Sequence, residues 1–431
     1  MPTLYLMQGP SGSGKTAFLH RWHLDDLVVS PDAMRDMANP FDHVAGDTAH
    51  SYRDYSPETS VEAFELAETL CRARMRLGST VIVDSCAVSR RSIDRFVRLA
   101  RAYGYGVAYV RMDATVSKCL AADAARPPWV GVEPEVVRRQ FSRLGRFAYE
   151  SDERVIGCHE LLREGSSCID VSQFGTIVVV GDVHACYGRL EAAGLGHDAW
   201  VANRSTLYVF CGDLLDRGPD PLGTLRAFAD PQCANVIVCT GNHDVHIGQM
   251  ARGDPVPRTT RETTLEPVVD AIGAADAREL FGRVYRRLVP CVQFDWAGTR
   301  YLVSHAGLEP AVDVCDLSGP DDLGRIEGSP YLGFLPARTV AYGMTRTPHR
   351  SDYGADVDHM IAMAEVGLEA RVAGLGIDRP RTVQIHGHRN SSLAPAMAEP
   401  LSINLEGGVE RGGALRVLTL MPGCGPVVRE V

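Results

Sequence analysis

The sequence lacks any long apolar segment, and this excludes one class of protein at once. A helix that spans a bilayer needs about 20 consecutive apolar residues, and no stretch of the 431-residue chain approaches that length. The apolar run Thr3–Met7 is too short for a secretory signal and leads directly into a glycine-rich loop. We therefore expect a protein that has no contact with a membrane.

Paired cysteines and an excess of positive charge are also missing. Twelve cysteines are scattered without CxxC spacing, and Cys86, Cys119 and Cys211 lie within apolar runs. This favours reduced thiols and a cytoplasmic location over a disulfide scaffold. The net charge of -10 argues against an extended grip on a nucleic-acid backbone, which needs a basic surface. Binding of a strand end stays compatible with this charge.

A glycine-rich loop follows the first predicted strand. Gly9–Thr16 reads GPSGSGKT, which is the GxxxxGK[ST] pattern between a strand and a helix. Backbone N–H groups in such a loop, and at the helix N-terminus after it, bind phosphate. We predict that Lys15 reaches the β- and γ-phosphates of ATP and that the Thr16 hydroxyl holds Mg²⁺. The predicted nucleotide site comprises Gly9, Ser11, Gly12, Ser13, Gly14, Lys15 and Thr16.

A second predicted strand, Leu27–Val29, leads into Ser30-Pro31-Asp32-Ala33-Met34-Arg35. A carboxylate at this position can accept a proton from an attacking hydroxyl group. Arg35, three residues after Asp32 on a predicted helix, is placed to hold a phosphate. An N-cap aspartate followed by a surface arginine explains the pattern equally well.

Strands and helices alternate through the rest of this half. A predicted helix at Val61–Leu77 precedes a strand at Thr80–Ser85, whose Asp84 has a Walker-B-like position. A predicted helix–loop–helix then carries Arg126, Arg138 and Arg139, either as a lid that clamps phosphate or as surface ion pairs. The order predicts a doubly wound parallel sheet with its site at the carboxyl ends of the strands. The chemistry indicated is phosphoryl transfer to a hydroxyl group.

The longer half of the chain repeats one local pattern. Five predicted strands run into Asp, Asn or His, and the motifs at their ends are Gly181–His184, Gly212–Gly218, Gly241–Asp244, His305–Gly307 and His386–His388. Oxygen and imidazole groups are ligands for small divalent cations. If the five strands belong to one sheet, these side chains converge on a metal centre.

A phosphoesterase centre with two metals needs a bridging carboxylate, because the ions lie about 3.5–4 Å apart. Asp213 is the natural bridge. Asp182 and His184 are then expected on one metal, and Asn242, His305 and a later histidine on the other.

Three further residues have predicted roles beside the metals. His243 follows Asn242 and is free to protonate a leaving alkoxide, and Asp216 can fix its tautomer. Arg217 offers a bidentate fork to phosphate.

The polar stretch Ser151–Ser172 marks the predicted boundary between domains at 1–165 and 174–431. Two predicted inserts, Val245–Pro290 and Glu309–Arg381, separate the motifs of the second domain. Candidate substrate contacts within them are Arg258, Arg261, Tyr342, Arg346, His349 and Arg350, although any one residue of this kind is more often plain surface.

The loop Gly9–Thr16, the hexapeptide Ser30–Arg35 and the strand Val81–Asp84 resemble the 5′-OH polynucleotide kinase module. The resemblance implies that Lys15 and Thr16 bind ATP and Mg²⁺ and that Asp32 is the general base. It implies Arg35 as the contact to the 3′-phosphate of the acceptor nucleotide. The family has paired lid arginines, which implies Arg126 as a substrate contact, although two prolines and Trp129 follow it here.

The quartet GDxH, GDxxDRG, GNHD and SHAG resembles the phosphoprotein-phosphatase-type branch of the binuclear metallophosphoesterases. This implies a β-sandwich flanked by helices, with Mn²⁺ or a similar ion. It also implies His388 in Gly387-His388-Arg389 as the last ligand, with His386 as the alternative, and leaves Arg389 as a possible phosphate contact. Near the C-terminus the family has Ile-Asp-Thr-Gly, and either Asn404 or Glu406 takes the place of that aspartate.

The two halves together resemble bacterial polynucleotide kinase-phosphatases, which heal RNA ends. The expected partners are RNA or DNA strand ends. Because the sequence ends at Val431, sealing is expected to need a separate RNA ligase. One alternative is a small-molecule or nucleotide kinase fused to a diadenosine-polyphosphate hydrolase or a phosphoprotein phosphatase. Another is a P-loop sensor that regulates a phosphatase.

Overall fold

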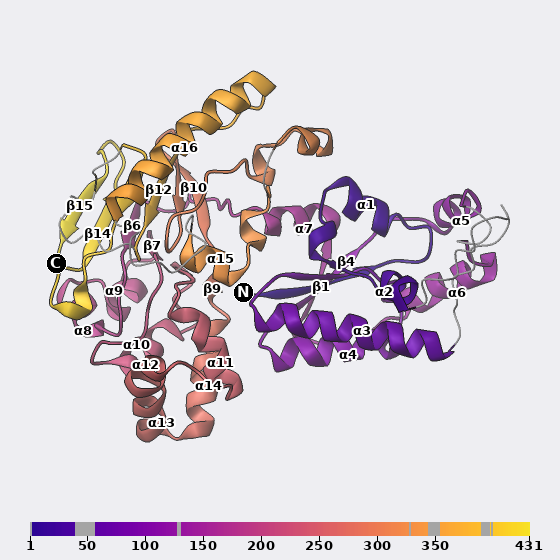
Figure 1. The fold of residues 1–431 in the computed structure, drawn as a ribbon, viewed down its shortest axis with the longest axis horizontal. Helices are drawn as coiled ribbons and strands as arrows, with labels where there is room; N and C mark the ends of the chain where they lie inside the picture. Colours follow the sequence, from indigo (N-terminus) through magenta and orange to yellow (C-terminus); the bar gives the residue numbers. More distant parts are fainter. Residues whose placement is uncertain are drawn as a thin grey trace. The chain divides into compact units, whose positions relative to one another are not determined.

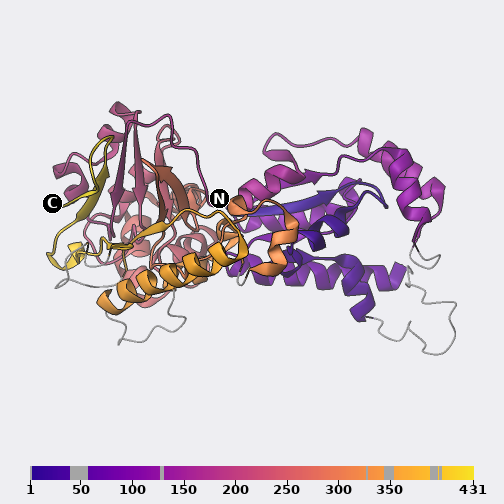
Figure 2. The ribbon, with the colours of Figure 1, turned by 90° about the horizontal axis from the view of Figure 1, so that it is seen from above.

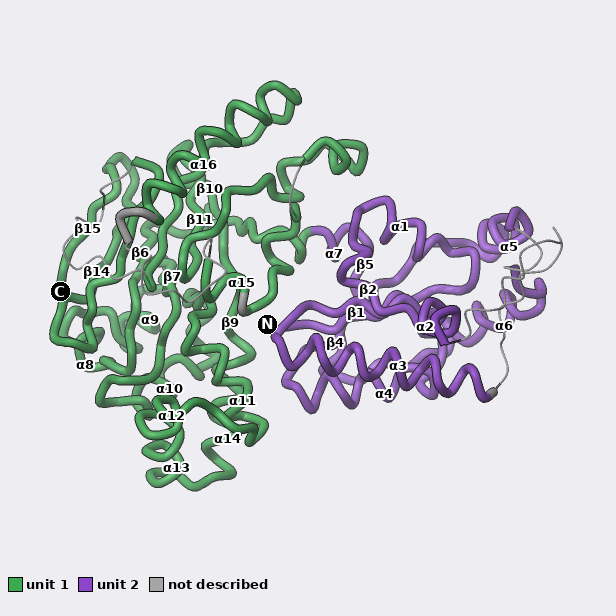
Figure 3. Tube along the Cα trace, viewed as in Figure 1, with its two compact units in different colours: residues 1, 163–431 green, residues 2–162 purple. Residues whose placement is uncertain are grey.

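The computed structural model describes residues 2–38, 57–126, 131–326, 329–343, 354–388, 397 and 400–431. The chain divides into two compact units, Pro2–Leu162 and Arg163–Val431 (Figure 3). The division falls within Ser151–Ser172, but this stretch is not the linker that its composition suggested. It contains strand β5 (Glu153–Gly157) and helix α7 (Cys158–Gly165). The strand has exposed polar positions because it lies at the edge of the first unit's sheet.

The first unit is a parallel five-stranded sheet with helices on both faces, which confirms the predicted doubly wound fold. The strand order is β2-β3-β1-β4-β5. Helices α3 and α4 pack on one face, and α1 and α7 lie on the other (Figure 1). The elements are β1 (Thr3–Gln8), α1 (Lys15–Arg21), β2 (Val28–Val29), α2 (Pro31–Ala38), α3 (Pro57–Arg76), β3 (Val81–Val83), α4 (Arg90–Ala102), β4 (Gly106–Arg111), α5 (Val116–Ala124) and α6 (Pro134–Gly145).

The strands of this sheet are short and apolar because both of their faces are covered. The sequence pattern predicted a strand that begins at Leu27. In the structure Leu27 belongs to a 3₁₀ turn, Asp25–Leu27, and β2 begins at Val28. The carboxyl ends of β1, β2 and β3 lead into the glycine-rich loop, helix α2 and Asp84 respectively. The predicted nucleotide residues therefore share one edge of the sheet.

The second unit is a sandwich of two sheets, which confirms the β-sandwich that the resemblance implied. The strands that carry the motifs are divided between the two sheets and do not all belong to one. The larger sheet has the order β15-β14-β6-β7-β8-β9, and the smaller has β10-β11-β12-β13. The strands of this unit can be followed in Figure 2. Apolar side chains of both sheets form one shared core. The strands are β6 (Thr176–Val180), β7 (Thr206–Phe210), β8 (Val236–Cys239), β9 (Leu288–Val289), β10 (Val292–Trp296), β11 (Thr299–Val303), β12 (Thr382–His386), β13 (Ser402–Asn404), β14 (Arg416–Leu420) and β15 (Val427–Glu430).

Helices cover the outer faces of the sandwich. A second apolar core joins the larger sheet to helices that include α8, α10 and α14, and α16 packs against β13 of the smaller sheet. The helices are α8 (Tyr187–Ala192), α9 (His197–Ala202), α10 (Pro221–Phe228), α11 (Ile247–Arg252), α12 (Arg258–Thr260), α13 (Glu266–Ile272), α14 (Ala274–Tyr285), α15 (Ala337–Tyr342) and α16 (Gly354–Leu375). Across the described ranges, every helix is too short or too polar to traverse a lipid bilayer.

Candidate metal centre and nucleotide loop

The predicted metal ligands come together where strands of both sheets end. His305, after β11, has its Nε2 atom 3.0 Å from Oδ1 of Asn242 and 3.1 Å from Nδ1 of His388. The same nitrogen lies 3.5 Å from Oδ2 of Asp213. His184 Nε2 is 3.7 Å from that carboxylate oxygen. Asp213 thus lies between histidines from the two sheets, as a bridging ligand must.

The donor atoms form overlapping groups, each compact enough to hold an ion. One consists of Asp182, His184 and Glu406, and a second of Asp213, His305 and His388. A third, of His184, Asp213 and His243, shares one residue with each of the other two. The prediction placed Asp182 and His184 on one metal and His305 with a later histidine on the other. Two of the three expected histidines are oriented by a backbone carbonyl on the far side of the ring: His184 Nδ1 lies 3.1 Å from the carbonyl of Leu215, and His305 Nδ1 lies 3.2 Å from that of Cys211. Such contacts fix which ring nitrogen faces a metal.

The backbone around the centre is strained. Among the described residues, nine non-glycine positions have a positive φ, and five of them belong to this site: His184, Asp213, Asp216, Arg217 and His388. Such conformations cost about 1–3 kcal/mol each and gather at functional sites. The strands end near one another, and the turns with positive φ that follow them orient the side chains toward the metal centre.

Glycine is required at two points where carboxylates approach the backbone. A Cβ atom at Gly387 would lie 1.9 Å from Oδ1 of Asp182, and one at Gly241 would lie 2.2 Å from Oδ1 of Asp213. The glycines of the motifs therefore make room for the ligands rather than supplying flexibility.

The charges of the site fit a cation. Burial, and next the negative charge of Glu406, raise the pKa of Asp182 well above its usual range. Two carboxylates buried side by side repel one another, and a divalent ion between them removes that penalty. Burial also opposes ionisation of Asp213, but the histidines around it, His305 first, lower its pKa. Carboxylate oxygen and imidazole nitrogen donors suit Mn²⁺ and similar ions.

Glu406 is the residue that the sequence pattern left undecided against Asn404. Asn404 ends β13, and its Oδ1 accepts a hydrogen bond of 3.0 Å from the backbone N–H of Glu406. The amide thus shapes the turn, while the carboxylate two residues later joins Asp182 and His184. His386, the alternative last ligand, lies instead 2.9 Å from Asp358. It belongs to none of the ligand groups among the described residues.

Metal removal is expected to destabilise this unit. A ligand at 100 times its dissociation constant stabilises the folded state by about 2.7 kcal/mol, so Mn²⁺ should raise the melting temperature of the chelator-treated chain. Glu406→Gln should raise the melting temperature without metal, because it removes the repulsion with Asp182, and should weaken the response to Mn²⁺. Exposed Asp198 provides the control, Asp198→Ala. Equal responses in both variants would contradict this assignment.

A hydrogen-bonded chain supports His243 beside the centre. Its Nδ1 lies 2.6 Å from Oδ2 of Asp216. Thr260 Oγ1 and Thr264 Oγ1 donate to the two oxygens of Asp216, each at 2.6 Å. Burial disfavours the protonated ring, but the bond to Asp216 raises the pKa of His243 above its usual value. The two threonines come from the first insert, where no local pattern marks them as partners of Asp216.

Arg217 lies at the metal centre, where it contacts two histidines and lines a cavity. Its two terminal nitrogens lie 3.2 Å from His184 Nε2 and 2.9 Å from His243 Nε2, and one of them donates to Glu410 at 3.1 Å. A cavity of about 90 Å³ lies beside it, lined by Asp182, His184, Asp213, Arg217, Asn242, His388, Glu406, Glu410 and Arg411. Sequence analysis missed Glu410 and Arg411, which follow Glu406 by four and five residues.

The glycine-rich loop of the first unit has the shape of a phosphate site. Lys15 Nζ donates to the carbonyls of Gly9 and Pro10 at 2.8 and 3.0 Å. A Cβ atom at Gly12, whose φ is +76°, would lie 2.2 Å from the carbonyl oxygen of Cys119. Thr16 Oγ1 donates to Asp84 at 2.7 Å, so the two groups that would hold Mg²⁺ are already paired. Burial raises the pKa of Asp84, and a cation there would offset that cost.

The other predicted residues of the glycine-rich loop include Ser11, Ser13 and Gly14, which lie close to Lys15 in the chain. Ser13 Oγ lies 3.4 Å from Lys15 Nζ, and the backbone N–H of Ser11 donates to Gln140 of α6 at 2.8 Å. Gly14 has φ of +90°, a conformation that glycine adopts without penalty.

Asp32 and Arg35 form an ion pair on helix α2. The Asp32 side chain is half exposed, whereas that of Arg35 is buried and lies 3.5 Å from Ser60 of α3. Arg126 is paired with Asp123 at 3.4 Å, and Arg138 with Glu135 at 2.6 Å.

Three of the candidate contacts in the inserts, Arg258, Arg261 and Tyr342, belong to the described residues. Arg258 and Arg261 form exposed ion pairs with Glu262 and Glu266. The Tyr342 ring centroid is 6.3 Å from that of His388, so this residue reaches the centre. Arg346, His349, Arg350 and Arg389 lie outside the described residues.

Comparison with known proteins defines the class of each unit. Residues 4–148 match the family model of the AAA domain, and residues 175–330 match that of calcineurin-like phosphoesterases. The chain therefore joins a P-loop kinase-like domain to a calcineurin-like metallophosphoesterase domain, and such domains imply a nucleotide with Mg²⁺ and divalent metal ions respectively.

Among individual proteins, the symmetrical bis(5′-nucleosyl)-tetraphosphatase of Proteus mirabilis is 33% identical over 137 residues, which cover 32% of this chain and 46% of that protein. The one of Escherichia coli K12 is 32% identical over 136 residues, 32% of this chain and 45% of that protein. The chain thus spans less than half the length of these relatives. The structure of a protein serine/threonine phosphatase from Saccharomyces cerevisiae is 14% identical, covers 63% of this chain and 85% of that one, and has a TM-score of 0.37.

Proposed function

We propose that this chain heals broken RNA ends. Its first unit would transfer the γ-phosphate of ATP to a 5′-hydroxyl end, and its second would remove a 3′-phosphate or a 2′,3′-cyclic phosphate with Mn²⁺. A separate ligase would then seal the strand. The observation that carries the proposal is the Asp32–Arg35 pair beside a phosphate loop, in a chain whose other half carries a phosphoesterase centre.

The kinase half has the groups that this transfer needs. Asp32 is half exposed, so its carboxylate is open to accept the proton of an incoming hydroxyl group. Arg35 is buried behind it, and its guanidinium both orients that carboxylate and offers charge to a phosphate of the acceptor. Lys15 would neutralise the charge that builds up on the transferred phosphoryl group.

The phosphoesterase half has residues that would bind the phosphate and residues that would protonate the leaving group. When bound, two divalent ions would polarise the phosphate and activate a water molecule. Arg217 presents its guanidinium beside the cavity and contacts His243. In this structure Arg217 donates to Nε2 of His243. With that guanidinium turned to the phosphate, Nε2 would be free to carry a proton toward the leaving alkoxide, because Asp216 accepts at Nδ1 and favours the protonated ring.

His243→Ala tests this assignment by the leaving group. General acid catalysis contributes about 10²–10⁴-fold, so the variant should lose that much rate on a nucleoside 3′-phosphate and far less on nitrophenyl phosphate, whose leaving group needs no proton. His246→Ala removes a nearby histidine that contacts Gln249 and should match the native chain. Equal losses on both substrates would contradict a general acid.

The substrate class is tested by competition. The second unit would be given a 3′-phosphorylated RNA, a 2′,3′-cyclic RNA end and a dinucleoside tetraphosphate under identical metal conditions. The proposal predicts that kcat/KM for one of the RNA ends exceeds that for the dinucleotide by at least tenfold. The reverse order would overturn it.

A second candidate rests on the relatives of the phosphoesterase domain. Those with about one third identity are symmetrical bis(5′-nucleosyl)-tetraphosphatases, which favours dinucleoside polyphosphate hydrolysis by the second unit. The first unit would then be a small-molecule or nucleotide kinase. Transfer of phosphate to a 5′-hydroxyl RNA separates the two candidates, because only the end-healing proposal requires it.

A further inference from the structure

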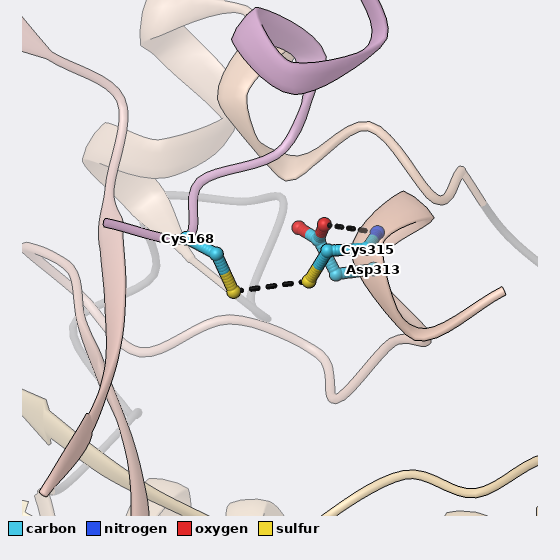
Figure 4. Close-up of side chains that lie close together, drawn as sticks. All are labelled: Cys168, Asp313 and Cys315. Atoms are coloured by element: carbon cyan, nitrogen blue, oxygen red, sulfur yellow. Dashed lines mark hydrogen bonds between the residues drawn. The ribbon is translucent and has the colours of Figure 1, made fainter. Parts of the chain in front are cut away.

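Two cysteines of the second unit face each other outside the metal centre. The sulfur atoms of Cys168 and Cys315 are 3.0 Å apart, and Figure 4 shows the two side chains pointing toward one another. Cys168 is partly exposed and Cys315 is exposed, so the pair is open to solutes. The residues lie 147 positions apart in the chain, which makes their meeting a product of the fold.

The backbone holds both sulfur atoms in place. Cys168 forms a β-bridge with Gln293 of β10. On either side of it, the backbone N–H of Ile169 donates to the carbonyl of Gln293, and the N–H of Gln293 donates to the carbonyl of Ser167, each at 2.8 Å. Cys315 lies in a 3₁₀ turn, Val314–Asp316, that begins with a capping box at Asp313.

Asp313 connects the two segments directly. Its buried carboxylate accepts from the backbone N–H of Ser167 at 3.3 Å and from Gln293 Nε2 at 3.0 Å on one oxygen, and from the N–H of Cys315 at 3.0 Å on the other. Both cysteines are therefore anchored to one carboxylate, and their approach does not depend on flexible side chains.

We infer that Cys168 and Cys315 are a redox site that forms a reversible disulfide when the protein meets a hydroperoxide. The inference is independent of the proposed end-healing activity. Zinc fits the geometry less well, because two thiolates on a tetrahedral zinc ion lie roughly 3.8 Å apart, given Zn–S bonds of about 2.3 Å. Asp313, the third candidate ligand, already accepts hydrogen bonds on both oxygens.

The two thiols have different roles. A hydrogen bond from Cys315 lowers the pKa of Cys168, and Arg300 lowers it further against the effect of burial. The pKa of Cys315 is raised, since its proton is held by Cys168. Sγ of Cys315 also lies 3.9 Å from Oδ1 of Asp316, and a carboxylate disfavours a thiolate beside it. Because the thiolate is the nucleophile, Cys168 is assigned as the attacking sulfur and Cys315 as the resolving one.

The reaction balances with the peroxide as the oxidant. The Cys168 thiolate attacks one oxygen, the O–O bond breaks, and the departing oxygen takes a proton to leave as water or an alcohol. The resulting sulfenic acid is attacked by the Cys315 sulfur, the S–O bond breaks, and the hydroxide takes the Cys315 proton and leaves as water. Two electrons pass from the sulfurs to the peroxide. A small-molecule dithiol then reduces the disulfide by thiol–disulfide exchange.

The test is a peroxide titration of the full chain. Residual thiols are alkylated, and the protein is digested without reductant. We expect a cross-linked peptide pair containing Cys168 and Cys315, lighter by two hydrogen atoms than the separate peptides and lost on treatment with dithiothreitol. Cys424, which is also exposed, should remain alkylated as an internal control.

Cys315→Ser should stop the reaction at the sulfenic acid of Cys168, which a dimedone probe captures. The peptide pair in the native chain decides the matter even if this variant folds poorly. Alkylation of both cysteines after peroxide treatment would overturn the inference. So would one equivalent of zinc in the purified chain that Cys168→Ser removes.

Discussion

Asp213→Ala is expected to abolish phosphoesterase activity and to leave kinase activity unchanged. Asp213 is buried between histidines of both sheets, and it also accepts a hydrogen bond of 2.9 Å from the backbone N–H of His243. Loss of the bridge would remove metal stabilisation worth several kcal/mol, or at least about 10³-fold in rate. Hydrolysis of nitrophenyl phosphate with Mn²⁺ measures the effect.

The matched control for this variant is Asp198→Ala, which removes an exposed carboxylate of the same unit. It should keep native activity. Retention of more than a tenth of the activity in Asp213→Ala, with normal metal content, would show that Asp213 does not bridge the ions.

Asp32→Asn is expected to abolish phosphoryl transfer and to spare the phosphoesterase. The amide has nearly the shape of the carboxylate and leaves ATP binding by Lys15 and Thr16 intact, but it cannot accept the proton of the attacking hydroxyl group. The loss should be about 10²–10⁴-fold in kcat, measured by transfer of labelled γ-phosphate to a 5′-hydroxyl oligonucleotide.

Asp26→Asn is the control, because Asp26 is an exposed carboxylate just before β2, at the opposite end of the strand from Asp32. A variant at Asp32 that binds ATP and transfers phosphate at the native rate would rule out this residue as the base.

The sequence predicted what local chain geometry determines. A strand followed by a short polar motif places that motif at the strand's carboxyl end, so the predictions of the two α/β domains and of the edges that carry Lys15, Asp182 and Asp213 needed no knowledge of distant contacts. The kinase-like class of the first unit and the phosphoesterase class of the second follow from the same motifs.

The sequence did not predict what depends on pairing between distant segments. The resemblance implied a sandwich, but not which strand belongs to which sheet, because that is set by which strand edges pair and by the core between the sheets. Glu153–Gly157 lacks the alternating pattern of a half-buried strand, because it is an edge strand in which the consecutive residues Arg154 and Val155 are both exposed.

Residues from distant segments that contact the site residues were also not predictable from the sequence. Thr260 and Thr264 contact Asp216 across more than forty positions of the chain, and no local pattern marks them. Glu406 was recognisable only as one of two polar residues at the end of a strand, and its carboxylate lies in one compact group with Asp182 and His184.

A single RNA with a 5′-hydroxyl and a 2′,3′-cyclic phosphate tests the central claim most directly. It would be incubated with ATP, Mg²⁺ and Mn²⁺ and with the native chain, Lys15→Ala or Asp213→Ala, and both ends would be analysed. The account predicts that the native chain converts both ends, that Lys15→Ala leaves the 5′ end untouched, and that Asp213→Ala leaves the cyclic phosphate untouched. An RNA unchanged by a native chain that binds both nucleotide and metal would contradict it.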